Sequence, residues 1–270
     1  MPLPALAAVA GLVAAAHVFK KNQGNGAKNG SRSVAINESD KKHMLSLINS
    51  GTDGIKEAMQ MSQSFGHEQI DLSGMYIPVI AIEESEIPLK INASNSYIEK
   101  MRMENISLES SSMVGSSFNE FKIYECVISE TQFNNSEFTF LSIDRSDVTR
   151  SSFSNCVCRD YHSNILNCIF DSSDMSKIIL RGASIFNSTF KSCNFSQSKI
   201  NRSIFRELEF IECIMDEFDI NETKLKDVQG IDLGPRRKII GVPLGHKKVV
   251  SHFGRTAILP RGNENEMEDE

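Results

Sequence analysis

Four side chains with the chemistry of zinc ligands lie close together in the chain: Cys156, Cys158, His162 and Cys168. Thiolates and imidazoles are the usual ligands of tetrahedral zinc, so this group is a candidate metal site. The spacing argues against it. Structural sites favour cysteine pairs separated by about two to four residues, whereas a single residue separates Cys156 from Cys158, which strains chelation of one ion.

Other chemical motifs are missing from the sequence. Residues 22–33 form a basic linker rich in Gly and Asn, but its glycines and Lys28 do not match the phosphate-binding pattern G-x-x-x-x-G-K-[ST]. No Ser, His and Asp occur in an order and context that suggest a catalytic triad. The sequence therefore predicts no enzyme, and no catalytic, cofactor-binding or metal-binding residue.

The composition is that of a soluble protein in a reducing compartment. The 270 residues are 40% hydrophobic and 24% charged, which suits one elongated domain or two ordinary ones. The 6 cysteines have no paired spacing, so they do not indicate a disulfide framework. The net charge of −6 favours solubility and argues against nucleic acid as the partner.

The N-terminal segment is different, because residues 3–19 (LPALAAVAGLVAAAHVF) carry no charge and are followed by Lys20 and Lys21. A membrane-spanning helix needs about 20 apolar residues, so this segment is near the lower limit. The lysines after the apolar run predict that the rest of the chain stays in the cytoplasm, on the inner side of a membrane. A soluble cytoplasmic protein with a buried or partner-binding helix, and an export signal, remain as alternatives.

Large apolar residues recur every five residues through the middle of the chain. After residue 158 the series skips two residues and resumes at 165 with the same step. It comprises Ile98, Met103, Leu108, Met113, Phe118, Ile123, Ile128, Phe133, Phe138, Ile143, Val148, Phe153, Cys158, Ile165, Phe170, Met175, Leu180, Ile185, Phe190, Phe195, Ile200, Phe205, Phe210, Met215, Ile220 and Leu225. A period of five fits neither an α-helix nor a simple strand, and it indicates an internal repeat.

A small residue usually precedes each large one by two positions, as Ser116 precedes Phe118 and Thr131 precedes Phe133. The larger exceptions at this small position are Phe121, Leu141, Ile178, Leu208 and Phe218. The other three residues of each five are mostly polar. The pattern therefore predicts that two residues of every five point inward.

This pattern resembles the pentapeptide-repeat family, whose repeat is a small residue, Asp or Asn, Leu or Phe, and two polar residues. The segments CNFSQ (193–197), SEFTF (136–140) and IDLSG (70–74) carry the resemblance. It implies an all-β fold, a right-handed quadrilateral β-helix in which four pentads make one square coil. About seven coils, stacked at about 4.8 Å, are then expected. The pattern is blurred between Ile77 and Ile91 and interrupted near His162.

The resemblance also gives the cysteines a structural role. Cys126, Cys156, Cys168, Cys193 and Cys213 occupy the small inward position, and Cys158 occupies the large one. Free cysteine behaves as a small buried apolar residue. We therefore expect thiols that are held apart on different sides of the coils, with His162 in a solvated loop.

The expected organisation has six parts. Two short helices should close the start of the repeat. The first is capped by Ser39 and carries Leu45 and Ile48; the second, Thr52 to Ser64, carries Ile55 and Met59. The parts are a hydrophobic segment (1–21), a basic linker (22–37), a helical cap (38–66), the β-helix (67–230), a basic segment (231–262) and an acidic tail (263–270).

The polar positions are charged in bands, which directs the function to the outer surface. Residues 99–147 carry mostly acids, residues 171–206 mostly bases, and residues 207–222 only acids. We expect a non-enzymatic interaction module or scaffold with an unknown protein partner and association with a membrane through residues 3–19. Some members of the family protect gyrase by mimicking DNA with an acidic rod, which is one alternative; an effector delivered into a host cell is another. The basic segment could contact anionic lipid or nucleic acid, or simply be neutralised by the acidic tail. It lacks the interleaved aromatic residues that stack on bases.

Overall fold

The fold is taken from a computed structural model of the chain. The chain divides into two units, residues 1–32 and 33–270, and only the second contains described residues. The predicted membrane segment, most of the basic linker and the acidic tail lie outside the described residues. Among the described helices, none is long and apolar enough to cross a membrane. The structure describes residues 34–160, 162–231, 239, 243–244, 246–250 and 256–260, the last two ranges by their backbone alone.

Two helices form the cap, as the sequence predicts. They are α2 (Glu38–Ile48) and α3 (Thr52–Ser64). The predicted N-cap was wrong: Asn37, not Ser39, caps α2, because its side-chain oxygen accepts a hydrogen bond from the backbone N–H of Asp40 at 2.9 Å. Asn37 lies just before the first helical residue, whereas Ser39 is already inside the helix.

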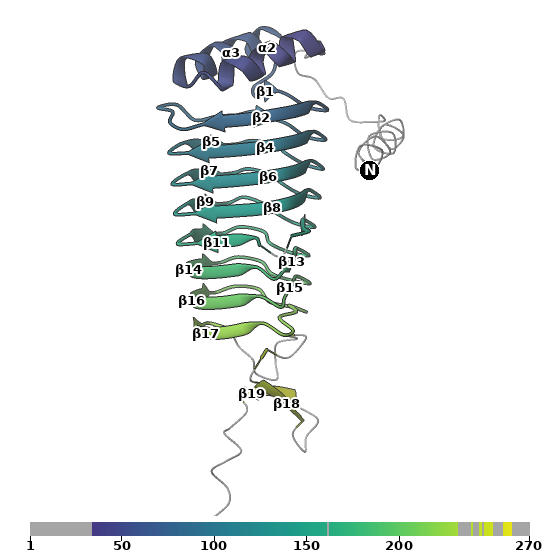
Figure 1. Cartoon of the computed structure of the whole chain (residues 1–270), viewed down its shortest axis with the longest axis vertical. Coiled ribbons are helices and arrows are strands. Elements are labelled where there is room, and N and C mark those ends of the chain that lie inside the picture. The colour runs from purple at the N-terminus through teal and green to yellow at the C-terminus, as the bar shows by residue number, and fades with distance from the viewer. Residues whose placement is uncertain are drawn as a thin grey trace, which may run out of the picture. The chain divides into compact units, whose positions relative to one another are not determined.

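The two helices pack closely on each other and on the first coil of the solenoid (Figure 1). Gly54 of α3 makes the close approach possible, because a Cβ at this position would lie 2.0 Å from the carbonyl oxygen of Leu47. Met44 and Ile48 of α2 and Ile55 of α3 are fully buried. They cover the apolar end of the stack, which a solenoid has to close.

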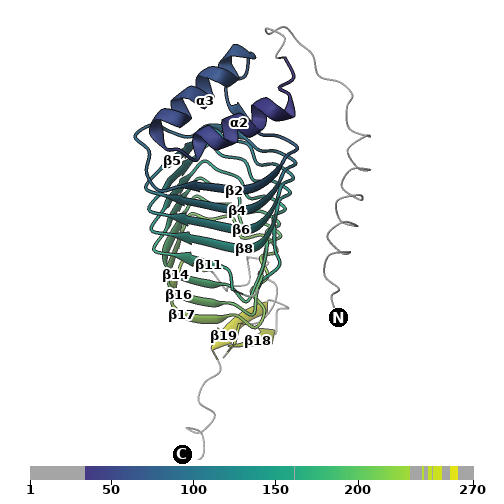
Figure 2. The same ribbon diagram turned by 45° about the horizontal axis from the view of Figure 1, so that its top comes forward.

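Beyond the cap, the chain winds into parallel strands that stack coil on coil (Figures 1 and 2). There are about eight coils, one more than expected. The strands are β1 (Ile70–Asp71), β2 (Tyr76–Ile82), β3 (Ile91–Asn92), β4 (Tyr97–Glu104), β5 (Ser107–Glu109), β6 (Ser117–Tyr124), β7 (Val127–Ser129), β8 (Glu137–Asp144), β9 (Asp147–Thr149), β10 (Val157–Cys158), β11 (Asn164–Leu166), β12 (Ile169–Asp171), β13 (Ile179–Arg181), β14 (Ser184–Lys191), β15 (Lys199–Asn201), β16 (Ile204–Ile211) and β17 (Lys224–Gln229).

The strand register confirms four pentads to a coil. Phe118 of β6 pairs with Phe138 of β8, and Ile185 of β14 pairs with Phe205 of β16, each twenty residues further on. Every other inward-pointing residue of the period-five series is buried as well, except Leu225, which is only partly buried. The quadrilateral β-solenoid inferred from the resemblance is therefore the fold of this chain.

Two irregularities explain where the sequence pattern fails. Cys158 pairs with Phe138 and Ile165 with Ile143, so two extra residues form the loop around His162, as predicted. In the first coil Ile82 pairs with Met103, but Leu89 bridges to Leu108. The chain therefore takes seven residues from Ile82 to Leu89, where the next coil takes five from Met103 to Leu108.

The side that follows in the first coil is one residue shorter, because Asn92 bridges to Ser112. The pattern is blurred between 77 and 91 because an insertion and a deletion follow each other there. The coil nevertheless closes.

Phenylalanine side chains stack in columns through the interior. Phe170, Phe190 and Phe210 form one column, with ring centroids 5.0 and 5.1 Å apart. Phe118 and Phe138 form another, at 4.8 Å. Both columns were predicted from the spacing of twenty residues. The interior is filled by side chains throughout the described coils.

A residue in the left-handed conformation stands just before many of the small positions. These residues include Asn135, Asn155 and Gly115, for which the conformation costs little. They also include Glu125 and Lys177, for which it is strained. The corner geometry is thus imposed by the stacking of coils and not by local preference, and the sequence pattern did not indicate it.

The solenoid ends at β17, and the next described elements are two antiparallel strands, β18 (His246–Val250) and β19 (Thr256–Pro260). Both strands belong to the segment predicted as basic. One hydrogen bond links this region to the last coil, from the backbone N–H of Leu244 to the carbonyl oxygen of Thr223 at 3.0 Å.

Candidate functional site

The outward-facing charges of the first coils are arranged in ion pairs between neighbouring coils. Arg145 and Arg150 contact the carboxylates of Glu125 and Glu130 at 3.1 and 3.0 Å, each one coil away. Glu120 contacts both Arg102 and Lys122 at 2.7 Å. Such exposed pairs contribute at most about 1 kcal/mol each. Their main effect is to offset part of the acidic charge in this half of the solenoid.

A different side of the middle coils gathers positive charge. Arg159, Lys177, Arg181, Lys199 and Arg202 are all exposed on or beside the sheet formed by β10, β13 and β15. We call this set the basic face. The register places Ile179 directly beside Lys199 and Arg181 beside Asn201, so the cations come from adjacent coils.

The members of the basic face differ in how they are neutralised. Arg159 contacts Glu137 at 2.6 Å and Arg202 contacts Glu222 at 2.9 Å. Lys177, Arg181 and Lys199 form no ion pair with any residue that the structure describes. The band of bases along the sequence thus comes together on three successive coils, with Asp219 one coil beyond Lys199.

Exposed apolar side chains lie on the same side of the first coils. The rings of Tyr76 and Tyr97 stack at 5.7 Å and are 54% and 46% exposed. The Tyr76 hydroxyl donates a hydrogen bond to Glu99 at 2.6 Å, which raises the pKa of Tyr76 because the carboxylate stabilises the protonated phenol. Tyrosine is enriched in protein interfaces because it offers a rigid apolar surface with a polar end.

Another side of the solenoid carries almost no charge along the coils. Its outward column is Asn92, Ser112, Gln132, Ser152, Asp174 and Asn194, bridged from coil to coil. A side-chain hydrogen bond along it runs from Asn194 to Asp174 of the preceding coil at 3.2 Å. The four sides of the solenoid therefore present distinct surfaces.

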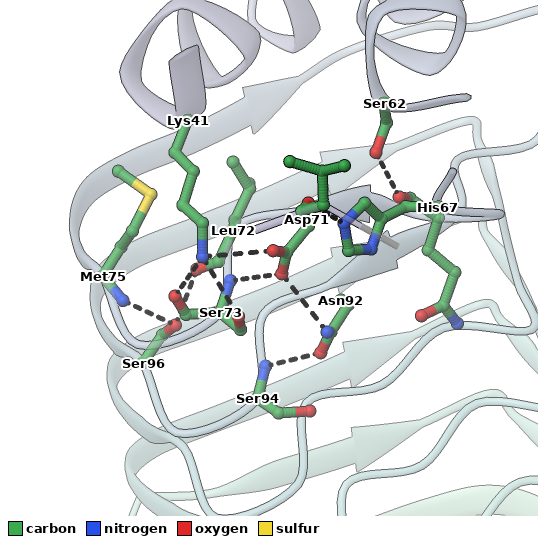
Figure 3. Close-up of polar contacts among 12 residues, drawn as sticks. Lys41, Ser62, His67, Asp71, Leu72, Ser73, Met75, Asn92, Ser94 and Ser96 are labelled. Atoms are coloured by element: carbon green, nitrogen blue, oxygen red, sulfur yellow. Dashed lines mark hydrogen bonds and ion pairs between the residues drawn. The ribbon is translucent and has the colours of Figure 1, made fainter. Parts of the chain in front are cut away.

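A buried ion pair fastens the helical cap to the first coil (Figure 3). Lys41 of α2 reaches Asp71 of β1 at 3.2 Å and donates to the carbonyl oxygen of Ser73 at 2.7 Å. The other Asp71 oxygen accepts hydrogen bonds from Ser73 N–H at 3.1 Å and from Asn92 at 3.3 Å. Burial raises the pKa of Asp71, but the hydrogen bonds from Ser73 and the charge of Lys41 outweigh it and hold the pKa below its usual range.

A surface cleft of about 420 Å³ opens beside this ion pair. Two of its polar groups are engaged within the fold: His67 Nε2 contacts the carbonyl oxygen of Val34 at 2.9 Å, and Gln69 donates to the carbonyl oxygen of Ser110. Asp71 is held by Lys41. We therefore interpret the cleft as part of the contact between the cap and the first coils, and not as a ligand site. It is lined by His67, Glu68, Gln69, Asp71, Lys90, Asn92 and Ser110.

The cysteines take the inward positions that the repeat predicts. All six are buried, whereas His162 is exposed and contacts Asp160 at 2.9 Å. Burial raises the pKa of Cys156 and of Cys168 to about 12 each, so these thiols stay protonated at neutral pH. The structure does not bring the four candidate ligands together. Among the described residues, no group of three His, Cys, Asp or Glu side chains could hold a metal ion.

One expectation about the thiols was wrong. Cys193 and Cys213 are not held apart, because they occupy the same inward position one coil apart. The neighbouring Cys213 thiol, together with burial, raises the pKa of Cys193. Their contact follows from the twenty-residue repeat, which places the two positions directly above each other.

The solved structures to which this chain is similar include the following two. One is HetL, a pentapeptide repeat protein involved in heterocyst differentiation regulation from the cyanobacterium Nostoc sp. strain PCC 7120. It is 10% identical, with a TM-score of 0.33, and the match covers 59% of this chain and 82% of HetL. The other is QnrB1, a plasmid-mediated fluoroquinolone resistance protein. It is 15% identical, with a TM-score of 0.26, and the match covers 59% of this chain and 76% of QnrB1. No family model matches the sequence, and no curated protein matches it significantly.

Proposed function

We propose that this pentapeptide-repeat β-solenoid is a non-enzymatic interaction module that binds a partner protein through its outer sides. The observation that carries the proposal is the contrast between inside and outside. The interior is filled by buried side chains, and Asp71, His67 and Gln69 of the cleft are engaged in the fold. The outer sides differ sharply in charge and polarity, which suits selective recognition.

A rigid sheet side is a suitable binding surface because its side chains are fixed before a partner arrives. A side about 12 Å wide, formed by about eight coils stacked at about 4.8 Å, offers roughly 450 Å². A stable interface needs about 800 Å² from each partner. The partner should therefore cover two adjacent sides or reach around a corner. The first coils, where Tyr76 and Tyr97 are exposed, are the strongest candidate for its centre.

The location of the protein remains part of the proposal. The uncharged residues 3–19, followed by Lys20 and Lys21, would attach the chain to the cytoplasmic surface of a membrane. We expect the full chain to sediment with membranes and a chain beginning at Asn22 to stay in the soluble fraction. Leu12→Lys should release the full chain, because it charges the middle of the apolar segment. If all three fractionate alike, residues 3–19 do not attach the protein to a membrane.

Proximity labelling in the native cell tests the proposed function. The full chain should label a small, reproducible set of proteins, and a chain with the unfolding substitution Phe190→Asp should not. A matched control, Thr189→Asp, changes the neighbouring outward residue and should preserve labelling unless the partner contacts it. Equal labelling by the folded and unfolded chains would contradict the proposal.

One feature favours a second candidate function, inhibition or protection of a DNA-binding enzyme such as gyrase. Residues 207–222 carry acids and no base, as a surface that mimics DNA would require. The basic face lies next to this acidic end and interrupts it. A supercoiling assay with a stoichiometric excess of the protein distinguishes this candidate from the general interaction module, because a DNA mimic must change the activity of gyrase.

A further inference from the structure

We infer that the basic face binds an acidic extended segment, and that the acidic tail of the chain itself, residues 264–270, occupies it. The tail has the sequence ENEMEDE and carries five acids. It lies outside the described residues, so the inference rests on the surface, on the composition of the tail and on the distance that the tail must cover.

The surface offers unpaired cations in a fixed arrangement. Lys177 and Arg181 lie in one coil and Lys199 in the next, and none of the three has an ion pair within the described part of the chain. Adjacent coils are separated by about 4.8 Å, so the three like charges raise the local positive potential. An anionic segment that covered them would relieve this repulsion.

The tail has the complementary pattern. Glu264, Glu266, Glu268 and Glu270 alternate with other residues. In an extended chain, alternate side chains point to the same face, so these four carboxylates would form a row with a spacing of about 6.7 Å. A flat sheet with several exposed cations can contact such a row along its length.

The tail is long enough to reach the basic face. Leu244 is hydrogen-bonded to Thr223 in the last coil, and Pro260 pairs with His246 across the two final strands. Pro260 therefore lies within roughly 17 Å of Thr223, given the spacing of residues and strands. The ten residues after Pro260 can span up to about 33 Å. Glu222, which precedes Thr223, already contacts Arg202 of the basic face.

Zero-length carbodiimide coupling of the full chain tests the inference, because it joins only carboxylates and amines that are in contact. Mass spectrometry should find links from the tail glutamates to Lys177 or Lys199. Links should be abundant at about 0.05 M salt and fall at least tenfold at about 1 M salt, where charge interactions are screened. Links only to Lys247 or Lys248 would mean that the tail neutralises the final strands, and would overturn the inference.

A binding experiment provides a second readout. A synthetic peptide of residues 261–270 should bind the full-length variant with Glu264, Glu266, Glu268 and Glu270 changed to Gln. The unchanged chain should bind it at least tenfold more weakly, because its own tail competes at an effective concentration near the millimolar range. Equal affinity would overturn the inference, as would links that form only between isotopically distinct copies.

Substitutions on the surface identify the contact. Combining Lys177→Glu, Arg181→Glu and Lys199→Glu should remove the salt-sensitive binding of the peptide. The matched control combines Lys100→Glu, Lys191→Glu and Lys224→Glu, which change exposed cations elsewhere on the solenoid and should leave binding within about twofold. Both variants should keep the thermal unfolding temperature of the unchanged chain. Loss of binding in the control alone would place the contact elsewhere.

Discussion

Replacing Phe190 with alanine tests the packing of the solenoid where it is most specific. The ring is fully buried in the middle of a column, stacked on Phe170 at 5.0 Å and on Phe210 at 5.1 Å. Phe195 contacts it edge-on at 5.2 Å. Phe190→Ala would therefore remove contacts with three rings from three successive coils.

The expected loss in the free energy of unfolding is about 3–5 kcal/mol, the usual range for a buried phenylalanine. The upper part of the range applies here, because each aromatic pair adds about 0.5–1.5 kcal/mol beyond the area it buries. For a unit of this size, that loss corresponds to a fall in Tm of roughly 10 °C. Phe190→Asp should be more damaging, because it buries a charge without a partner.

Circular dichroism, followed during thermal and guanidinium unfolding, measures the effect. Hydrogen exchange adds a local readout, because neighbouring coils of a solenoid can open separately. The matched control is Ile169→Ala, since Ile169 is 50% exposed beside the same column and its truncation should cost less than about 0.5 kcal/mol. If Phe190→Asp left thermal unfolding unchanged, the inward register would be wrong.

Three further predictions concern the cap, the thiols and the corners. Asp71 has a lowered pKa in the folded chain, so its ionised carboxylate stabilises the docked cap above the unfolded pKa of about 3.9, and this stabilisation is lost as pH falls through the folded pKa. Asp71→Asn should abolish the acid-dependent loss of hydrogen-exchange protection in the cap. The six buried thiols should react with a thiol reagent at pH 8 only slowly in the native protein and completely after denaturation, and fast native reaction of Cys156 or Cys168 would contradict their burial. Cys156→Ser and Cys168→Ser should fold, with far less than one zinc per chain in the parent protein; stoichiometric zinc lost on either change would restore the metal site. Lys177→Asn should raise the unfolding free energy by about 0.5–1 kcal/mol, because Asn tolerates the left-handed conformation at φ 56° better than Lys, and no gain in a denaturant titration would show that the corner is not strained.

The repeat could be predicted from the sequence because every coil needs large apolar residues at the same inward positions. Each of these positions must fill the same narrow interior, so a residue such as Phe118 or Phe190 indicates its own place in the coil. A count of twenty residues then predicted the stacked columns. The same count would have placed Cys193 over Cys213, had it been applied to the small positions as well as to the large ones.

Other features depend on contacts that no local pattern records. The pairing of Lys41 with Asp71 requires the cap to dock on the first coil, and thirty residues separate the two side chains. In the first coil, a two-residue insertion before Leu89 is partly offset by a one-residue deletion after it. The basic face combines residues from three coils across the two-residue insertion. The sequence shows that this stretch is basic, but only the fold shows which of its cations lie on the same side.

The central claim is that the chain acts by binding a protein through its outer sides, and site-specific photocrosslinking in the native cell tests it most directly. A photoreactive residue is placed singly at Lys199 on the basic face, at Tyr97 on the same side of an earlier coil, and at Gln132 and Ile169 on other sides. The account predicts that one protein is crosslinked strongly from one side or from two adjacent sides, and that Phe190→Asp abolishes the product. The absence of a side-dependent protein product from all four positions, in a chain that is folded, would contradict it.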